Sequence, residues 1–235
     1  MDFFYTPPHL ITPPSLVIEG DEFSHLVHVM RKGLHDEISV VDGNGNVYDA
    51  EISTLDRRSA MCTVKGHRTF VNEPTRKVVL GAALLRHSGN FDFLVEKVTE
   101  IGVHAIVPLR TERTIPSKAK IDRWQKLALA AMKQSQRCYL PIVRQATTFR
   151  DFVESADGDS TRLLPHESTA GPLLTEAIPA EAQKIILAIG PEGGFTQEEV
   201  LLASGHGFIV VSLGPRRLRA ETAAIVATAG SLLRD

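Results

Sequence analysis

The alternation of apolar and polar residues changes along the chain. Near the N-terminus, DEISVVDGNGNVYDAEIS (36–53) contains two alternating runs around Gly43–Asn46, which is the pattern of a β-hairpin. AMCTVKGHRTF (60–70) predicts a further strand, and EFSHLVHVMRK (22–32), followed by Gly33, predicts one helix. We therefore expect a small β-barrel or sandwich with one helix in this part of the chain.

After about residue 74, apolar runs alternate with helical patterns. The strand candidates are 78–85, 103–109, 161–165, 185–190 and 208–213. The helix candidates are 90–101, 121–137, 172–177, 197–204 and 220–233. This alternation, with β-branched strands, predicts a mostly parallel sheet with helices on both faces. Ligand sites in such sheets lie at the carboxyl ends of the strands.

The distribution of charge supports a boundary between the two parts. Residues 1–73 carry 6 Lys and Arg against 11 Asp and Glu, whereas residues 74–235 carry 20 against 17. The change falls at VNEPTRK (71–77), a polar stretch with a proline that is typical of a linker. We predict one domain over 1–73 and a second over 74–235.

Composition excludes several classes of protein. The apolar fraction of 43% and the net charge of −2 are ordinary for a globular protein and give no polyanion-binding tail. Cys62 and Cys138 have no metal-ligand spacing and are expected to be reduced thiols, so we expect no metal. No apolar run approaches the ~20 residues of a membrane span. The first residues have no basic segment and contain four prolines, which argues against a signal peptide and predicts a cytoplasmic protein.

A glycine-rich turn follows one of the buried strands. In IGPEGGFTQEEV (189–200), Gly190, Gly193 and Gly194 allow the backbone conformations of a tight turn and let a ligand approach the backbone closely. Thr196 and Glu199 form a capping-box pattern that begins a helix. The stretch lacks the spacing of dinucleotide and triphosphate loops, so an ordinary strand-to-helix turn remains the alternative to a binding site.

Two further loops repeat this arrangement. SLGPRRLRAETAAIVATAG (212–230) is a Gly-Pro turn with three arginines before a helix start, and Glu221 lies in the first helical turn, where the helix dipole favours an anion. LLPHESTAGPL (163–173) places His166 and Glu167 after another strand. In a parallel sheet, these three loops would share one edge. Each feature alone is also compatible with solvated loop residues.

A basic segment precedes these loops. Residues 108–144 contain 9 Lys and Arg against 2 Asp and Glu. Within it, Trp124, Leu127, Ala128, Ala131, Met132 and Ser135 follow a helical spacing that predicts a buried face. Cations on another side form a stripe of one sign, which favours contact with a phosphate backbone over a merely solvated face. The RNA-binding candidates are Arg31, Lys32, Arg110, Arg113, Arg123, Lys126, Lys133 and Arg137.

Taken in order along the chain, these motifs resemble one family. GPEGGFTQEE followed by LGPRRLRAETA closely resembles the RsmE family of 16S ribosomal RNA (uracil-N3)-methyltransferases, which belong to the SPOUT, or trefoil-knotted, class. HLVHVMRKG (25–33), VEKVTEIGVHAIVPLRTERT (95–114) and MKQSQRCYLP (132–141) resemble three more blocks of that family. The resemblance extends over nearly the whole chain.

The resemblance implies a fold, a cofactor and partners. It implies a PUA-like or OB-like β-barrel that helps to bind RNA, and an α/β domain with a trefoil knot. It implies S-adenosylmethionine as cofactor, 16S rRNA of the small ribosomal subunit as substrate, and a homodimer. The residues that would lie against the cofactor are Leu164, Pro165, His166, Gly190, Pro191, Gly193, Gly194, Leu213, Gly214 and Leu218.

The reaction suggests roles for three charged residues. Uracil N3 must lose its proton to become a good nucleophile, and a cation would stabilise the anion that develops on O2 and O4. Arg219 is the candidate for that cation. Glu192 or Glu221 could accept the proton, and the sequence does not rank them.

The chain departs from the family pattern at two positions. Arg217 stands where the family usually has isoleucine, and Ala220 stands where it has threonine. Two alternatives therefore stay open, a methyltransferase of the same class acting on another RNA position and a knotted RNA-binding protein without catalysis. Methyl transfer, as opposed to cofactor binding alone, separates them.

Overall fold

The computed structural model describes residues 3–115, 118–156, 158–167 and 171–233. The chain forms two compact units. The first contains Met1–Glu73 together with Leu129–Leu140, and the second contains Pro74–Ala128 and Pro141–Asp235. The expected strand-rich part and the expected α/β part are both present.

The first unit is built on one six-stranded sheet. In chain order, its strands are β1 (Phe3–Tyr5), β2 (Ile11–Thr12), β3 (Ser15–Glu19), β4 (Glu37–Val41), β5 (Asn46–Leu55) and β6 (Ser59–Thr69). Their order in the sheet is β1-β4-β5-β6-β3-β2, and all pairs are antiparallel except β1 with β4. Phe4 of β1 and Leu16 of β3 share one core although their strands lie near opposite ends of this order. The predicted hairpin is confirmed as β4–β5.

The helical part of this unit is shorter than predicted. It consists of η1 (Pro8–Leu10), α1 (Gly20–Ser24) and the π-helical turn η2 (His25–Val29). The expectation of a helix over 22–32 is wrong beyond Val29, because Arg31 has a φ of 54°, in the left-handed region. His35, with a φ of 68°, lies in the same region before β4 begins.

The second unit is built on a parallel sheet. Its strands are β7 (Lys77–Ala83), β8 (Ala105–Arg110), β9 (Ile142–Val143), β10 (Thr147–Thr148), β11 (Thr161–Pro165), β12 (Lys184–Ile189) and β13 (Ile209–Val211). Their order is β10-β8-β7-β12-β11-β13, with β9 also paired to β8. All of these pairs are parallel, which confirms the prediction. β12 is a central strand whose two faces are both covered, so its side chains Ile185–Ile189 are all buried and its sequence is an unbroken apolar run.

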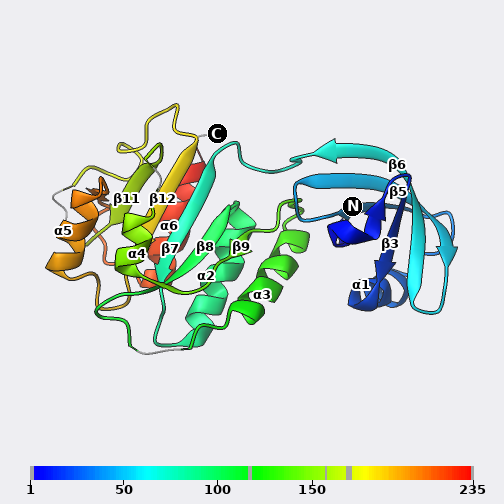
Figure 1. Ribbon diagram of the computed structural model, residues 1–235, viewed down its shortest axis with the longest axis horizontal. Coiled ribbons are helices and arrows are strands. Elements are labelled where there is room, and N and C mark those ends of the chain that lie inside the picture. The colour runs from blue at the N-terminus through cyan, green and yellow to red at the C-terminus, as the bar shows by residue number, and fades with distance from the viewer. Residues whose placement is uncertain (1–2, 116–117, 157, 168–170, 234–235) are drawn as a thin grey trace. The chain divides into compact units, whose positions relative to one another are not determined.

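Helices cover both faces of this sheet. They are α2 (Ser88–Ile101), α4 (Phe149–Glu154), α5 (Gln197–Gly205) and α6 (Ala220–Leu232). A further helix, α3 (Ile121–Gln134), begins in this unit, where the Trp124 ring packs on Phe91 of α2 with centroids 4.2 Å apart, and its end from Leu129 belongs to the first unit. Phe149 and Phe152 of α4 pack with Ala203 of α5 in the core on one face. α6 packs on β7, β12 and α2, and it lies on the face opposite α4 (Figure 1).

The helices of this unit differ from the prediction in two places. The expected helix at 172–177 is wrong, because Leu173 forms a bridge with Ser212 and the amide of Leu174 donates to the Ser212 carbonyl. The segment 172–177 therefore pairs with the segment around Ser212 and does not form the predicted helix. The sequence reading also missed α4, whose first turn is capped by the Thr148 hydroxyl, which accepts from the Asp151 amide at 3.1 Å.

Candidate functional site

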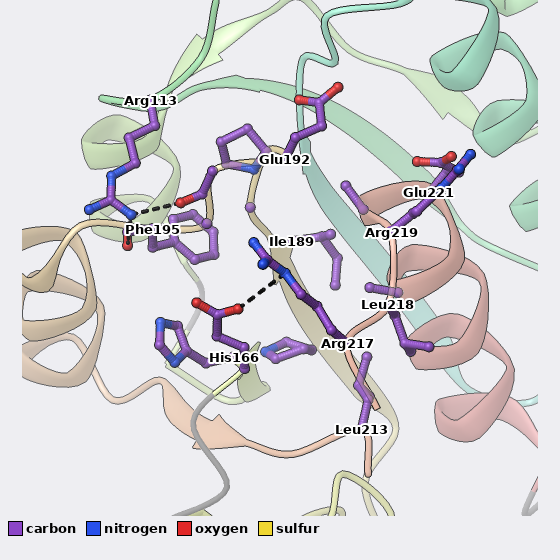
Figure 2. Close-up of a pocket in the computed structure, with 18 of the residues that line it drawn as sticks. Arg113, His166, Ile189, Glu192, Phe195, Leu213, Arg217, Leu218, Arg219 and Glu221 are labelled. Atoms are coloured by element: carbon purple, nitrogen blue, oxygen red, sulfur yellow. Dashed lines mark hydrogen bonds and ion pairs between the residues drawn. The ribbon is translucent and has the colours of Figure 1, made fainter. Parts of the chain in front are cut away.

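Three loops at one edge of the parallel sheet enclose a pocket. β12, β11 and β13 are neighbours and run in the same direction, so the loops that follow them meet at their carboxyl ends. The prediction that these loops share one edge is confirmed (Figure 2). The cavity between them has a volume of about 1000 Å³, within the range of sites for small molecules and cofactors.

The turn after β12 forms one wall. At Gly190 an added Cβ would lie 3.2 Å from the Phe195 ring, so a larger residue would require that buried side chain to shift. Gly194 has a φ of 70°, and its amide donates to the Pro191 carbonyl at 2.9 Å. The predicted capping box then begins α5. The Thr196 amide donates to Glu199 at 2.9 Å, and the Glu199 amide donates to the Thr196 hydroxyl at 3.2 Å.

Most of the residues expected to hold a cofactor line this pocket. Those found in its wall are Pro165, His166, Gly190, Pro191, Gly193, Gly194, Leu213, Gly214 and Leu218. Leu164 is the exception. Its side chain is fully buried in the core that also contains Ile186 and Ala188. Side chains alternate between the faces of a strand, so the Leu164 side chain supports the sheet beneath the pocket, and a place for Leu164 beside the cofactor stays a prediction.

The three candidate catalytic residues also line the pocket. Arg219 is the N-cap residue of α6, and its carbonyl accepts from the Ala223 amide at 2.8 Å. Glu221, in the first turn of α6, is 8% exposed and accepts a hydrogen bond from the Asn90 amide group at 3.2 Å. Glu192 is exposed and accepts from the backbone amide of Arg86 at 3.0 Å. Each carboxylate is thus held by one donor from the β7–α2 region.

The charged groups around the mouth of the pocket differ in their partners. Arg217 Nε lies 3.6 Å from Glu167 Oε2, an exposed ion pair that joins two of the loops (Figure 2). Within the described part of the chain, no hydrogen bond or ion pair engages the guanidinium of Arg219. A substrate anion that enters the pocket can therefore take up its donors.

The sequence reading missed one wall of the site. Arg86, His87 and Asn90, from the loop after β7 and the start of α2, line the pocket beside Glu192 and Glu221. β7 is the neighbour of β12 in the sheet. The rule that ligands bind at the carboxyl ends of parallel strands could have identified this loop once the strand order was known.

The basic stripe predicted on α3 is largely neutralised. Trp124, Ala128, Ala131 and Met132 are buried, as expected for its apolar face. Arg123 pairs with Asp92 at 2.9 Å, and Lys133 pairs with Glu22 at 2.6 Å. Lys126 is exposed. Arg123 and Lys133 are therefore paired within the protein, Lys126 is exposed, and the fourth member of the stripe, Arg137, is buried.

Arg137 lies in the core of the first unit. Its side chain is 3% exposed and pairs with Glu73, which is 5% exposed, at 2.7 Å. Glu73 also accepts from the amides of Cys138 and Tyr139, both at 2.9 Å. The prediction that Arg137 contacts RNA is wrong, because its charge is already satisfied inside the protein.

The other basic candidates occupy different surroundings. Arg31 is exposed, and Lys32 donates to the Glu37 carbonyl at 3.3 Å. Arg110 donates to the Ala146 carbonyl at 3.2 Å. Arg113 lines the pocket and donates to the Gly193 carbonyl at 2.7 Å. Arg113, one of the expected RNA contacts, thus lies in the wall of the site, and its contact with RNA stays a prediction.

The described residues offer neither a metal site nor a membrane-spanning helix. Among the described residues, no group of three or more His, Cys, Asp or Glu side chains could hold a metal ion. Over the same ranges, none of the helices has the length and apolar character needed to cross a membrane.

Comparison with known proteins shows a consistent relationship. Residues 72–231 match the family model of the RNA methyltransferase domain, and residues 18–65 match that of the RNA methyltransferase PUA domain. The ribosomal RNA small subunit methyltransferase E of Synechocystis is 38% identical, over 94% of this chain and 75% of that protein. A crystal structure of the enzyme of that name from Neisseria gonorrhoeae, bound to S-adenosyl methionine, is 31% identical with a TM-score of 0.87, over 97% of this chain and 95% of that one. A Legionella pneumophila methyltransferase in complex with the same cofactor is 28% identical with a TM-score of 0.83, over 96% and 94%.

Proposed function

The chain belongs to the RNA methyltransferase family that includes the ribosomal RNA small subunit methyltransferases E, and from this premise we propose that it methylates N3 of a uridine in 16S rRNA, using S-adenosylmethionine. Membership confirms the resemblance found in the sequence and implies the trefoil-knotted class for the second unit. The observation that carries the proposal is the pocket at the carboxyl ends of β11, β12 and β13, where a glycine turn, an arginine and two carboxylates meet.

The pocket fits the expected cofactor. An added Cβ at Gly194 or Gly214 would meet no protein atom within 4 Å, so open space adjoins the backbone at both turns. The apolar side chains of Ile189, Leu213 and Leu218 offer surfaces for a flat adenine ring. We infer that the backbone at Gly190, Gly194, Leu213 and Leu218 holds the adenosine part. Pro165 and His166 would lie on its other side.

The cofactor supplies an electrophilic methyl group on a positively charged sulfur. In the reaction, a carboxylate accepts the N3 proton, a bond forms between N3 and the methyl carbon, and the bond from that carbon to sulfur breaks. We propose that the Arg219 guanidinium stabilises the negative charge that develops on the uracil oxygens. Its side chain lies at the pocket wall and is exposed, which leaves its donors available to the base.

Two carboxylates can accept the proton. Glu221 is nearly buried and is held by Asn90, whereas Glu192 is exposed and is held by the Arg86 amide. The pair is separated by comparing single-turnover rates of Glu192→Gln and Glu221→Gln at saturating cofactor. Loss of the base lowers the rate by about 10²–10⁴-fold, and the other substitution leaves it within a few-fold of the unmodified enzyme.

The proposal extends to assembly and location. We propose that the protein acts as a homodimer in the cytoplasm on the RNA of the small ribosomal subunit. Exposed apolar side chains on and just after α6, Val226 at 41% and Leu233 at 82%, support a partner surface near the end of the chain. Light scattering on the purified protein tests the dimer independently of activity.

The decisive test of the function is a methyl-transfer assay. Purified protein is mixed with labelled S-adenosylmethionine and with small subunits from a strain that lacks the gene. Nuclease digestion followed by mass spectrometry then locates the label. We expect it on N3 of one uridine in 16S rRNA. Label on another base atom or in another RNA would refute the substrate, and bound cofactor without any transfer would refute catalysis.

A further inference from the structure

The glycine turn of the pocket has limited support from its own backbone. The bond from the Gly194 amide to the Pro191 carbonyl, 2.9 Å long, closes it. Gly193 is exposed and Gly194 is half-buried. Glycine loses more conformational freedom on ordering than any other residue, so a turn with two of them needs restraint from outside to keep one shape.

Arg113, in the loop after β8, supplies that restraint. Its Nη1 donates to the Gly193 carbonyl at 2.7 Å and lies 3.4 Å from the Phe195 carbonyl, so it joins the residues on both sides of Gly194 (Figure 2). A Cβ added at Gly193 would lie 3.4 Å from Arg113 Cδ. The stem of Arg113 therefore lies within van der Waals contact distance of this glycine.

Arg113 is itself held in a short, bonded segment after β8. The Thr111 amide donates to the Thr114 hydroxyl at 2.9 Å, and the Thr114 amide donates to the Thr111 carbonyl at 3.1 Å. The Glu112 amide donates to Glu199 at 2.9 Å. Since Glu199 also caps α5, this segment is fixed to the end of the same turn that Arg113 contacts.

We propose that Arg113 is a positioning residue for cofactor binding, which acts by holding the Gly193–Phe195 turn in the conformation that receives S-adenosylmethionine. This inference rests on the proposed function, and it makes Arg113 responsible for the conformation of one wall of the cofactor site. Charge-assisted bonds to carbonyls are stronger than neutral ones, and a turn that is ordered before binding need not be ordered by the ligand.

Arg110 provides a matched control. It has the same charge and lies at the end of β8, three residues earlier, but its Nη1 donates to the Ala146 carbonyl at 3.2 Å. It lines a neighbouring cavity and not the cofactor pocket. If a positive charge in this region served only to attract RNA, the two arginines would behave alike.

The experiment measures the Kd of S-adenosylmethionine by calorimetry for the unmodified protein, Arg113→Ala, Arg113→Lys and Arg110→Ala. Steady-state kinetics with small subunits accompany it. We expect Arg113→Ala to raise the cofactor Kd about tenfold, the equivalent of one charge-assisted hydrogen bond, and Arg113→Lys to raise it less. The KM for cofactor should rise, while kcat at saturating cofactor and the KM for the subunit stay close to their original values. Arg110→Ala should leave the cofactor Kd unchanged.

Other results would overturn the assignment. An unchanged cofactor Kd with a raised KM for the subunit would make Arg113 an RNA contact, and an equal loss in Arg110→Ala would reduce the effect to general charge. If Arg113→Ala does not fold, a cofactor Kd in Arg113→Lys equal to that of the unmodified protein would also overturn it. Failure of the unmodified protein to bind S-adenosylmethionine would refute the proposed function itself.

Discussion

Gly194 allows the role of the turn in binding to be separated from its role in folding. Its φ is 70°, a conformation that a β-branched residue rarely adopts, and an added Cβ would meet no protein atom within 4 Å. Gly194→Val therefore costs backbone strain of about 1–3 kcal/mol without a steric clash inside the protein. In a chain of this size, each kcal/mol lowers Tm by about 2–4 °C.

The same substitution has a second effect if the cofactor lies against this turn. The branched side chain then occupies space that the adenosine needs. A site forced to accept an extra group loses about 1–3 kcal/mol, which corresponds to a rise in Kd of about 5- to 150-fold. Calorimetry with S-adenosylmethionine measures this effect, and thermal melting of the protein without ligand measures the strain.

Gly20 is the matched control for this experiment. It has a φ of 65°, and a Cβ there would also meet no atom within 4 Å, but it lies in the first unit. Gly20→Val should lower Tm to a similar extent and leave the cofactor Kd unchanged. A Gly194→Val protein that binds S-adenosylmethionine with its original affinity would refute the placement of the adenosine at this turn.

Three further predictions concern other residues. Arg219→Ala should lower the methylation rate by about 10²–10³-fold, as for loss of one charge-stabilising donor, while cofactor affinity stays close to the original; unchanged turnover would remove Arg219 from the mechanism. Glu73→Ala should cost about 3–5 kcal/mol of stability, measured by urea unfolding, because it leaves Arg137 buried without its counter-ion; Arg137→Met should cost less than Arg137→Ala because it fills the space. Burial raises the pKa of both Cys62 and Cys138 to about 11 from 9.0, so the unfolded chain ionises first as the pH rises. The stability that the two protonated thiols contribute to the folded state is therefore complete below pH 9.0 and is lost toward pH 11. Both thiols should also resist a thiol reagent at neutral pH until urea is added, and rapid labelling of the folded protein would contradict this.

The elements predicted best from the sequence are those whose signal lies in neighbouring residues. β12 is buried on both faces, so its sequence is a continuous apolar run, and the strand can be predicted without knowing the rest of the fold. α5 begins at a capping box that is local to Thr196 and Glu199. For these elements, short-range chemistry and tertiary packing favour the same structure.

The failures come from contacts between residues far apart in the chain. The segment 172–177 has an acceptable helical pattern, but Leu173 pairs with Ser212 across the fold. Arg137 has the sequence spacing of a surface stripe, yet it finds Glu73 and is buried. Arg113 resembles any other loop cation until the Gly193 carbonyl, eighty residues away, is placed beside it. Such partners depend on the order of strands, which periodicity does not encode.

The first unit combines two segments that are far apart in the sequence, and this affects when it can fold during synthesis. Its core includes Val41 and Val47 from the sheet together with Met132 and Cys138, and the counter-ion of Glu73 is Arg137. A chain emerging from the ribosome therefore cannot finish this unit when residue 73 appears. At translation speeds of about 5–20 residues per second, the missing piece arrives roughly 3–13 s later. During that interval the nascent sheet lacks the partner of Glu73 and leaves an apolar patch open, which makes it a candidate for chaperone binding.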